Sequence, residues 1–498
     1  MSALVLQGKV VTFDPATPVL EDAAVYVGDG TIEAVAPRTS PPPAGFDDAP
    51  RIRTGGAIYP GLIDLHSHLL YNLRTLWLPP RDEPYGTRDE WPNAATYGHD
   101  ISWPAKLLAK VAGEAVLVYA EVKAIVGGTT AIQGAPGTTK PYEGFLVRNV
   151  DNETFGTGRD AVSQSVITLT RDELEHRATL MSKGSVFVYH LAEGTNPKLL
   201  GEFRDVADAE CLRPELIAIH ATALGAGEFE RWKPQAGSIV WSPFSNLWLY
   251  RATTDVVAAR EHKIRICLGA DWGPSGSKNV LGELKVADIW NRDHLDRAFS
   301  DLELCEMVTT NPGDALARTW GSRVGRIEQG RTADLLVVDS RLEDVYRNLI
   351  ESIERDIRLV LVGGKARYGR NALMKAAGAE SSEKLPQAGR GRSLSLTGSK
   401  TPVSWAQVVE TLEAVRADPQ GALKHHENQK AFGEEPLELV PDMPEGPPLR
   451  SIEDLGAGDI PPLDTLRHDA AFFRLLTRKR APILDGLLDA LSGYYERA

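Results

Sequence analysis

The alternation of strand-like and helix-like segments between residues 59 and 321 restricts the fold of this chain more than any other feature. Short apolar, β-branched runs recur there, and helix-like segments with capping residues at Thr170–Glu173 and Thr254-Asp255 lie between them. Strands that alternate with helices form parallel sheets covered by helices. The candidate strands end at or near eight positions: His66, Gln133, Val150, Leu169, His190, His220, Ser242 and Asp271. Their number and the length of the region predict an α/β fold with a (β/α)8 barrel of the TIM type.

Two β-rich regions flank the alternating region. Residues 1–58 hold short apolar runs around a hairpin turn at Gly28-Asp29-Gly30. Residues 322–369 hold similar runs, the first of them at Val324–Ile327. Because neither region can bury a sheet alone, we expect residues 1–58 and 322–369 to form one composite β-sandwich beside a barrel of residues 59–321.

The remaining residues, 370–498, differ in composition from the rest of the chain. Glycine- and serine-rich stretches and a proline-rich stretch surround helical patterns at Trp405–Val415 and Phe472–Tyr494. We therefore expect a helical C-terminal extension that packs on the main body.

Composition excludes several classes of protein. The formal charge of −13 argues against a nucleic-acid partner, because such proteins concentrate Lys and Arg on one face. Three widely spaced cysteines, Cys211, Cys267 and Cys305, predict neither a disulfide framework nor a cysteine zinc site. The chain has no signal-like N-terminus and no apolar run long enough to span a membrane. We expect a cytoplasmic protein with no membrane partner.

Histidines and a carboxylate stand at the ends of the candidate strands. The first strand ends in His66 and His68, whose side chains point to the same side of a strand and can hold one cation. His190, His220 and Asp271 end three later strands. Because the active sites of such barrels lie at the carboxyl ends of the strands, we expect these side chains to converge on one rim. Nitrogen and oxygen donors of this kind suit zinc, iron or manganese.

Glu193 follows His190 by three residues, so its carboxylate can reach the same cavity without binding the metal. Each residue also has a purely structural interpretation. His190 and His220 could be hydrogen-bonded core histidines, Glu193 could be exposed in a loop, and Asp271 could cap a turn. Several such coincidences at successive strand ends explain the pattern less well than one metal site does. We expect the other seven histidines at the surface: His99, His176, His262, His294, His425, His426 and His468.

Taken together, these segments resemble the amidohydrolase superfamily, and within it the branch of cytosine deaminase, guanine deaminase and the triazine hydrolases. The resemblance covers about residues 3 to 370. It is carried by His66-Ser67-His68, His190-Leu191-Ala192-Glu193, His220, Ser242–Leu247, Leu268–Asp271, Thr309–Ala317 and Gly325–Leu335.

The resemblance implies a single divalent metal ion, zinc in the first place, with iron or manganese as alternatives. It implies four metal ligands: His66, His68, His190 and Asp271. It further implies that Glu193 is the proton shuttle and that His220 lies beside the metal-bound water. Two-metal members of the superfamily carry a bridging lysine on the fourth strand, and Ser165–Leu169 contains none.

The residue types fit hydrolytic chemistry. A Lewis-acidic metal lowers the pKa of its water to about 7, and the resulting hydroxide attacks an sp² carbon that carries nitrogen. Glu193 would pass a proton to the leaving nitrogen, Asp271 would orient or deprotonate the water, and His220 would stabilise the developing oxyanion.

Three functions are compatible with this pattern. The first is hydrolysis of a non-peptide C–N bond in a cyclic amide, amidine or amino-heterocycle. The second is a heterocycle deaminase that releases ammonia, and the third is a metal-binding barrel protein without turnover. Glu193 argues against the third, because a structural metal site needs no spare carboxylate. We expect a small-molecule substrate and leave a homo-oligomer open.

Aromatic residues surround the candidate site in the sequence. The insertion Tyr71–Pro104 contains Trp77, Trp91 and Trp103 and could form a substrate wall or a subunit contact. Trp272 follows Asp271, and Trp248 and Tyr250 follow Asn246; these rings could stack on a planar substrate or pack in the core. Trp241-Ser242-Pro243 replaces the His-Cys-Pro sequence that is frequent in ring deaminases of this branch.

Overall fold

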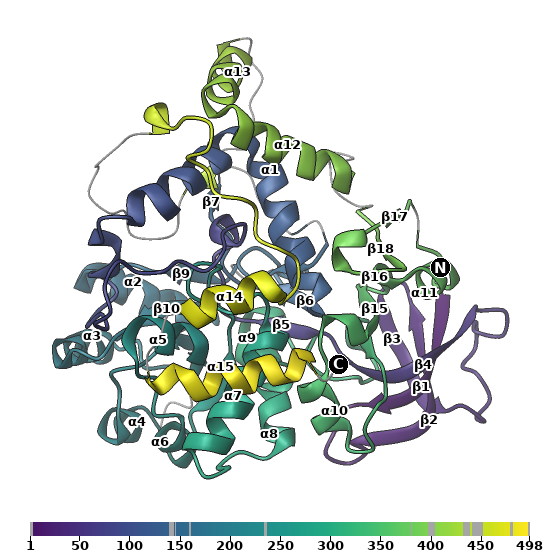
Figure 1. The fold of residues 1–498 in the computed structure, drawn as a ribbon. Helices are drawn as coiled ribbons and strands as arrows, with labels where there is room; N and C mark the ends of the chain where they lie inside the picture. The colour runs from purple at the N-terminus through teal and green to yellow at the C-terminus, as the bar shows by residue number, and fades with distance from the viewer. Residues whose placement is uncertain are drawn as a thin grey trace.

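The computed structural model describes residues 3–138, 144, 146–158, 161–233, 237–379, 381–396, 404–431, 439–440, 452–478 and 482–496. Its strands form sheets of nine, five and three strands and one two-stranded pair. Figure 1 shows the largest sheet at one side of a body in which helices surround the smaller sheets. No helix in these ranges is long and apolar enough to cross a membrane.

The middle of the chain forms two parallel sheets, as the alternation predicts. The three-stranded sheet contains β5 (Leu62–Asp64), β6 (Thr129–Ile132) and β8 (Arg148–Asn149). The five-stranded sheet contains β9 (Ser163–Ser165), β10 (Phe187–Leu191), β11 (Leu216–His220), β12 (Ser238–Trp241) and β13 (Arg265–Leu268). The two sheets meet where Ser67 pairs with Asp271 in a parallel bridge and the Asp271 amide donates to the His66 carbonyl oxygen at 2.8 Å.

Helices connect these strands and cover the sheets (Figure 1). They are α1 (Trp103–Val126), α2 (Arg171–Met181), α3 (Leu200–Asp208), α4 (Ala226–Trp232), α5 (Pro243–Tyr250), α6 (Val256–Glu261), α7 (Val280–His294), α8 (Asp301–Glu306) and α9 (Thr310–Trp320). Both predicted helix starts are confirmed. Thr170 forms a capping box with Glu173, and the Asp255 side chain accepts a hydrogen bond from the Ala258 amide.

The nine-stranded sheet combines both β-rich regions. Its strands are β1 (Ala3–Val11), β2 (Val19–Gly28), β3 (Thr31–Pro37), β4 (Arg51–Pro60), β14 (Leu335–Val338), β15 (Ile357–Val362), β16 (Lys365–Arg370), β17 (Glu383–Lys384) and β18 (Arg392–Leu394). The antiparallel pairing of β4 with β14 joins the two regions, with Pro60 opposite Leu335. One face of this sheet buries an apolar cluster that includes Leu6, Ile58 and Leu359.

Two details of the predicted β-rich regions are wrong. Val324–Ile327 is not a strand, because Gly325 adopts a φ of 88° and the Val324 carbonyl oxygen accepts a hydrogen bond from Arg331 instead of from a neighbouring strand. Strands also continue beyond residue 369, since β17 and β18 extend the large sheet. The C-terminal extension is therefore not purely helical.

The extension packs on the helices of the body. Its helices are α11 (Asn371–Ala376), α12 (Trp405–Ala417), α13 (Pro419–Ala431), α14 (Ala470–Arg478) and α15 (Pro482–Glu496), and α10 (Val345–Glu351) precedes them. α12 contacts α1, and α15 contacts α7 and α14. The predicted range Phe472–Tyr494 thus contains two helices, separated by residues outside the described ranges. A short pair, β7 (Gly137–Thr138) and β19 (Leu439–Val440), also links the extension to the body.

Candidate metal centre

All five predicted strand-end residues meet in one buried cluster. His66 and His68 follow β5, His190 and His220 lie on β10 and β11, and Asp271 follows β13. Each is almost completely buried. The sequence allows this close approach because residue 269 is a glycine: a Cβ atom there would lie 2.3 Å from the Cβ of His66.

Four ligand atoms converge within the cluster. The Nε2 atom of His66 lies 3.3 Å from Nε2 of His68 and 3.1 Å from Nε2 of His190. Oδ1 of Asp271 lies 3.3 Å from Nε2 of His66 and 3.5 Å from Nε2 of His68. Zinc bonds of about 2.0–2.1 Å at tetrahedral angles place ligand atoms about 3.4 Å apart. These separations match this value, and the described residues form two overlapping groups of potential metal ligands that share His66: His66, His68 and Asp271, and His66, His190 and His220.

The surroundings keep the imidazoles in the form that binds metal. Burial, together with the neighbouring histidines, holds the pKa of His66 and of His190 well below the usual value, so both rings are neutral. Nδ1 of His66 lies 2.8 Å from the Ser242 hydroxyl, which leaves Nε2 facing the cluster. The carboxylate of Asp64 accepts hydrogen bonds from the amides of His66 and Ala270 and so ties the ends of β5 and β13 together.

Glu193 and His220 form a second pair beside the four ligand atoms. Nε2 of His220 lies 3.5 Å from Oε1 of Glu193 and 4.0 Å from Oδ2 of Asp271. Asp271 therefore turns Oδ1 towards His66 and His68 and Oδ2 towards His220. Burial raises the pKa of Glu193 to about 7 and lowers the pKa of His220 to about 4. A carboxyl group with such a pKa can both accept and release a proton near neutral pH.

Hydrogen bonds fix the tautomer of His220. The Trp241 indole N–H donates to the Thr253 hydroxyl at 2.7 Å, and that hydroxyl donates to Oδ1 of Asn246 at 3.4 Å. The amide nitrogen of Asn246 then donates to Nδ1 of His220 at 2.9 Å. Because an amide nitrogen can only donate, Nδ1 of His220 is the acceptor, and Nε2 of the neutral ring carries the hydrogen. His220 is thus a hydrogen-bond donor towards the cluster.

The backbone is strained at three of the strand ends. Ala192, His220 and Asp271 adopt φ values of 51°, 63° and 63°, which place them in the left-handed region although none is glycine. Such conformations cost free energy and persist where the surrounding structure enforces them, often at functional sites. At these positions the side chain of Asp271 lies against His66, and that of His220 lies against Glu193.

The aromatic insertion after β5 covers the site within the same chain. The Trp91 ring lies 5.2 Å from the Trp272 ring, whose centroid is 6.4 Å from that of His68. Thr87 pairs with Gly194 in an antiparallel bridge next to Glu193. Of the two interpretations of this insertion, the structure supports a wall of the site.

Arg88 anchors the same insertion. Its guanidinium group donates to both carboxylate oxygens of Glu202 at 3.1 Å and to the Thr168 hydroxyl at 2.7 Å. Its amide donates to the Glu193 carbonyl oxygen at 3.2 Å. The insertion is therefore fixed to the loop that carries Glu193.

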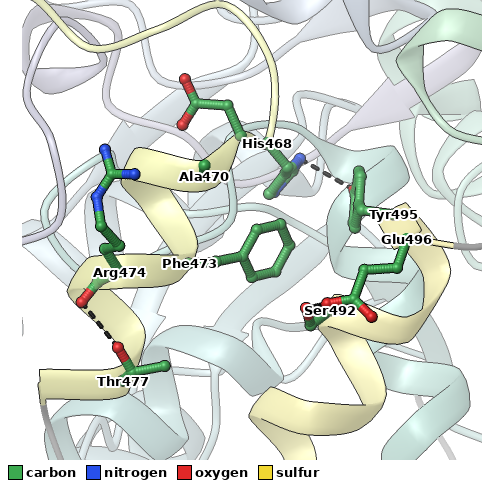
Figure 2. A pocket seen from close by; sticks show the side chains of 9 residues that line it. His468, Ala470, Phe473, Arg474, Thr477, Ser492, Tyr495 and Glu496 are labelled. Carbon is green, nitrogen blue, oxygen red and sulfur yellow. Dashed lines mark hydrogen bonds between the residues drawn. The ribbon is translucent and has the colours of Figure 1, made fainter.

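The prediction that seven histidines lie at the surface is wrong for His426 and His468, which are buried. Nδ1 of His468 lies 2.7 Å from Oε1 of Glu354 and 3.0 Å from the Tyr495 hydroxyl. Figure 2 shows His468 and Tyr495 among the residues that line a cavity between α14 and α15. The volume of this cavity is about 420 Å³. His468 forms its hydrogen bond with a glutamate more than one hundred residues away, so the residues around His468 do not indicate that it is buried.

Several residues of the site escaped the sequence analysis. Arg88 and Asp64 were not singled out, and Asn246 was noted only within a motif. Tyr250 was expected to stack on a substrate or to pack, but its hydroxyl donates to Oε1 of Glu193 at 2.6 Å. The polar residue Asn246 four positions before Tyr250 was the one available signal, because this spacing puts both side chains on one face of a helix.

Several known proteins are similar to this chain over most of their own length, although no protein-family model matches it. A 5-methylthioadenosine/S-adenosylhomocysteine deaminase of Syntrophobacter fumaroxidans is 26% identical over 411 residues, covering 73% of this chain and 92% of the relative. A 5'-deoxyadenosine deaminase of Methanococcoides burtonii is 23% identical over 425 residues, covering 72% and 91%. The crystal structure of an adenosine deaminase from Xanthomonas campestris with bound zinc shares the fold, with a TM-score of 0.62 and 19% identity over 85% of this chain and 98% of that chain.

Proposed function

We propose that this chain, which belongs to the amidohydrolase superfamily, deaminates an amino-heterocycle with the help of one bound zinc ion. The chain is a hydrolase of carbon–nitrogen bonds other than peptide bonds. The observation that carries the proposal is the buried pair of Glu193 and His220, 3.5 Å apart and beside the four converging ligand atoms. A metal site with only a structural role would need neither residue.

We assign the metal to four ligand atoms: Nε2 of His66, Nε2 of His68, Nε2 of His190 and Oδ1 of Asp271. Bound there, the metal supplies a Lewis acid that lowers the pKa of a water molecule to about 7. Three neutral imidazoles and one carboxylate form a donor set that suits zinc, and iron or manganese remain alternatives.

The side chains beside the ligands move the protons. Oδ2 of Asp271, turned towards His220, orients the attacking water and takes up its proton. Nε2–H of His220 donates to the oxygen that adds to the ring carbon and so stabilises its negative charge. Glu193 transfers a proton to the amino group, which leaves as ammonia while the ring carbon keeps the oxygen of water.

The substrate that we propose is an adenosine-like nucleoside. The two relatives are named for deamination of 5'-modified adenosines. In this chain the ring of Trp272 lies 6.4 Å from that of His68, and we propose that it provides a flat apolar surface for a planar base.

The test is a deamination assay on zinc-loaded protein. Adenosine, 5'-deoxyadenosine, 5'-methylthioadenosine, S-adenosylhomocysteine and guanine are incubated with the protein, and ammonia and the oxo-purine product are measured together. We expect stoichiometric ammonia and a 6-oxo purine from at least one adenosine derivative. Ring opening without ammonia would contradict deamination, and the absence of turnover on every compound would contradict the proposed substrate class.

We also infer the finer architecture. The parallel bridge between Ser67, after β5, and Asp271, after β13, supports one (β/α)8 barrel over residues 59–321. The pairing of β4 with β14 supports a composite sandwich of residues 1–58 and 322–369. β17 and β18 would add to that sandwich from the extension of residues 370–498. Cytoplasmic location and the lack of a nucleic-acid partner stay predictions, and a homo-oligomer stays open.

A further inference from the structure

We propose that Tyr250 and Trp91 are positioning residues that hold the Glu193 carboxylate for proton transfer. This inference rests on the proposed function, in which Glu193 is the proton shuttle, and it extends that function to a helix and a covering segment that carry no metal ligand. It is based on a hydrogen-bonded series of three buried side chains from separate parts of the chain.

The series has a fixed direction. The Trp91 indole nitrogen lies 3.0 Å from the Tyr250 hydroxyl oxygen, and that hydroxyl lies 2.6 Å from Oε1 of Glu193. An indole N–H can only donate, so the oxygen of Tyr250 accepts from Trp91 and its hydrogen goes to Glu193. Successive hydrogen bonds polarise one another in a buried, low-dielectric site, so the Trp91 contact strengthens the Tyr250 contact.

One face of α5 serves both members of the acid–base pair. Asn246 and Tyr250 are four residues apart on this helix and therefore lie on the same face. Asn246 donates to Nδ1 of His220 at 2.9 Å, and Tyr250 donates to Oε1 of Glu193. α5 begins directly after β12, with Ser242 as its N-cap, and it packs against α7. The helix thus aligns His220 and Glu193 with each other.

Trp91 brings the covering insertion into the series. It belongs to a short 3-10 helix, Trp91–Asn93, and its ring packs against Tyr97 and Trp272. The same insertion reaches Glu193 a second time, because the Arg88 amide donates to the Glu193 carbonyl oxygen at 3.2 Å. The insertion therefore fixes Glu193 through both its backbone and, by way of Tyr250, its side chain.

The consequence concerns which carboxylate oxygen moves the proton. Tyr250 and His220 both approach Oε1 of Glu193. With Oε1 engaged in this way, Oε2 is the oxygen that we assign to proton transfer. Loss of the Tyr250 hydroxyl would let the carboxylate rotate, so fewer encounters with bound substrate would be productive.

The test compares Tyr250→Phe with Tyr85→Phe. Tyr85 lies in the same insertion and is also buried, but its hydroxyl has no hydrogen-bond partner among the described residues. We expect Tyr250→Phe to lower kcat about 10- to 100-fold, with KM within twofold and metal content unchanged, because it removes a hydrogen bond to a charged group. Tyr85→Phe should keep the wild-type kcat.

A double-variant cycle tests the series itself. Trp91→Phe should lower kcat less than Tyr250→Phe does, and it should have no further effect once Tyr250 is phenylalanine, because its acceptor is then gone. Additive losses in kcat would overturn the series, and so would a Tyr250→Phe variant with kcat within twofold of the wild type.

Failure of this inference is distinguishable from failure of the proposed function. If Glu193→Gln abolishes turnover while Tyr250→Phe does not, the shuttle stands and the positioning role is refuted. If no substrate is turned over, the unfolding free energies of Tyr250→Phe, Glu193→Gln and the double variant still test whether Tyr250 and Glu193 interact. Non-additive losses would support the Tyr250–Glu193 contact, and additive losses would overturn it.

Discussion

Asp464 of the C-terminal extension binds two buried lysines, and its replacement by asparagine should destabilise the whole protein. Oδ2 of Asp464 lies 2.6 Å from Nζ of Lys123, and Oδ1 pairs with Nζ of Lys278. All three residues are buried. Lys123 comes from α1, and Lys278 comes from the loop after Asp271. One carboxylate thus neutralises cations from two separate parts of the body.

This cluster lies next to the segments that carry His66, His68 and Asp271. Nζ of Lys123 also donates to the Asn72 carbonyl oxygen at 3.0 Å. The Asn72 side chain donates to the Ser67 hydroxyl at 2.8 Å and accepts from the Gly273 amide at 3.2 Å. Ser67 stands between His66 and His68, so Lys123 and Asn72 connect Asp464 of the extension to the segment that carries both histidines.

The size of the effect follows from the burial. Removing one partner of a buried ion pair costs about 3–5 kcal/mol, because the remaining charge is left without compensation. In Asp464→Asn two ammonium groups lose their counter-charge together, so we expect the free energy of unfolding to fall by an amount in this range at pH 7. Urea unfolding followed by tryptophan fluorescence measures it. Glu175→Gln, which breaks the exposed Arg171–Glu175 pair at 2.8 Å, is the control and should change little.

The pH dependence gives a second check on the same variant. Burial lowers the pKa of Lys123 to about 8 even with Asp464 present, and loss of the carboxylate should lower it further. The unfolded chain then holds more protons than the folded variant, so the unfolding free energy of the variant rises as the pH increases from 7 to 9. The difference in unfolding free energy between the wild type and the variant therefore becomes smaller over this range. If this difference grew with pH, or if Asp464→Asn lowered the unfolding free energy by less than about 1 kcal/mol at pH 7, the three residues would not form a buried ion cluster of this strength.

Three further predictions concern the metal centre. His190→Ala should weaken metal binding by more than the roughly 10- to 100-fold expected when a residue that only hydrogen-bonds a ligand is lost. If this variant kept its metal through dialysis, His190 would not be a ligand. Glu193→Gln should keep the metal, measured by elemental analysis, and lose about 10²- to 10⁴-fold in kcat; turnover near the wild-type rate would remove the shuttle. Asn246→Leu should lower kcat about tenfold with unchanged metal content, because the tautomer of His220 is no longer fixed. An unaltered kcat there would show that His220 does not need a fixed tautomer.

The parallel sheets and the cluster at their ends could be predicted from the sequence for a physical reason. Burial on both faces forces apolar runs, and strands that run in parallel bring their carboxyl ends together. Polar residues that end such runs, as His66, His190 and His220 do, therefore converge in space. The large sheet was predictable for a similar reason, since neither β-rich region could bury its apolar face alone.

Contacts between side chains from distant segments were not predictable. The Tyr250–Glu193 hydrogen bond joins α5 to the loop after β10, and nothing in either segment specifies the other. The same holds for His468 with Glu354 and for Asp464 with its two lysines. The failure at Val324–Ile327 has another cause, because an apolar run predicts a strand only when no residue in it must adopt a positive φ, as Gly325 does.

The most direct test of the central claim is the metal content of the purified chain. Protein prepared without a metal-affinity tag is measured by plasma mass spectrometry, together with its turnover of 5'-deoxyadenosine before and after chelation and reconstitution. We expect about one zinc ion per chain, loss of ammonia release on chelation and its recovery when zinc is restored. Two metal ions per chain, or undiminished turnover by the metal-free protein, would contradict this expectation.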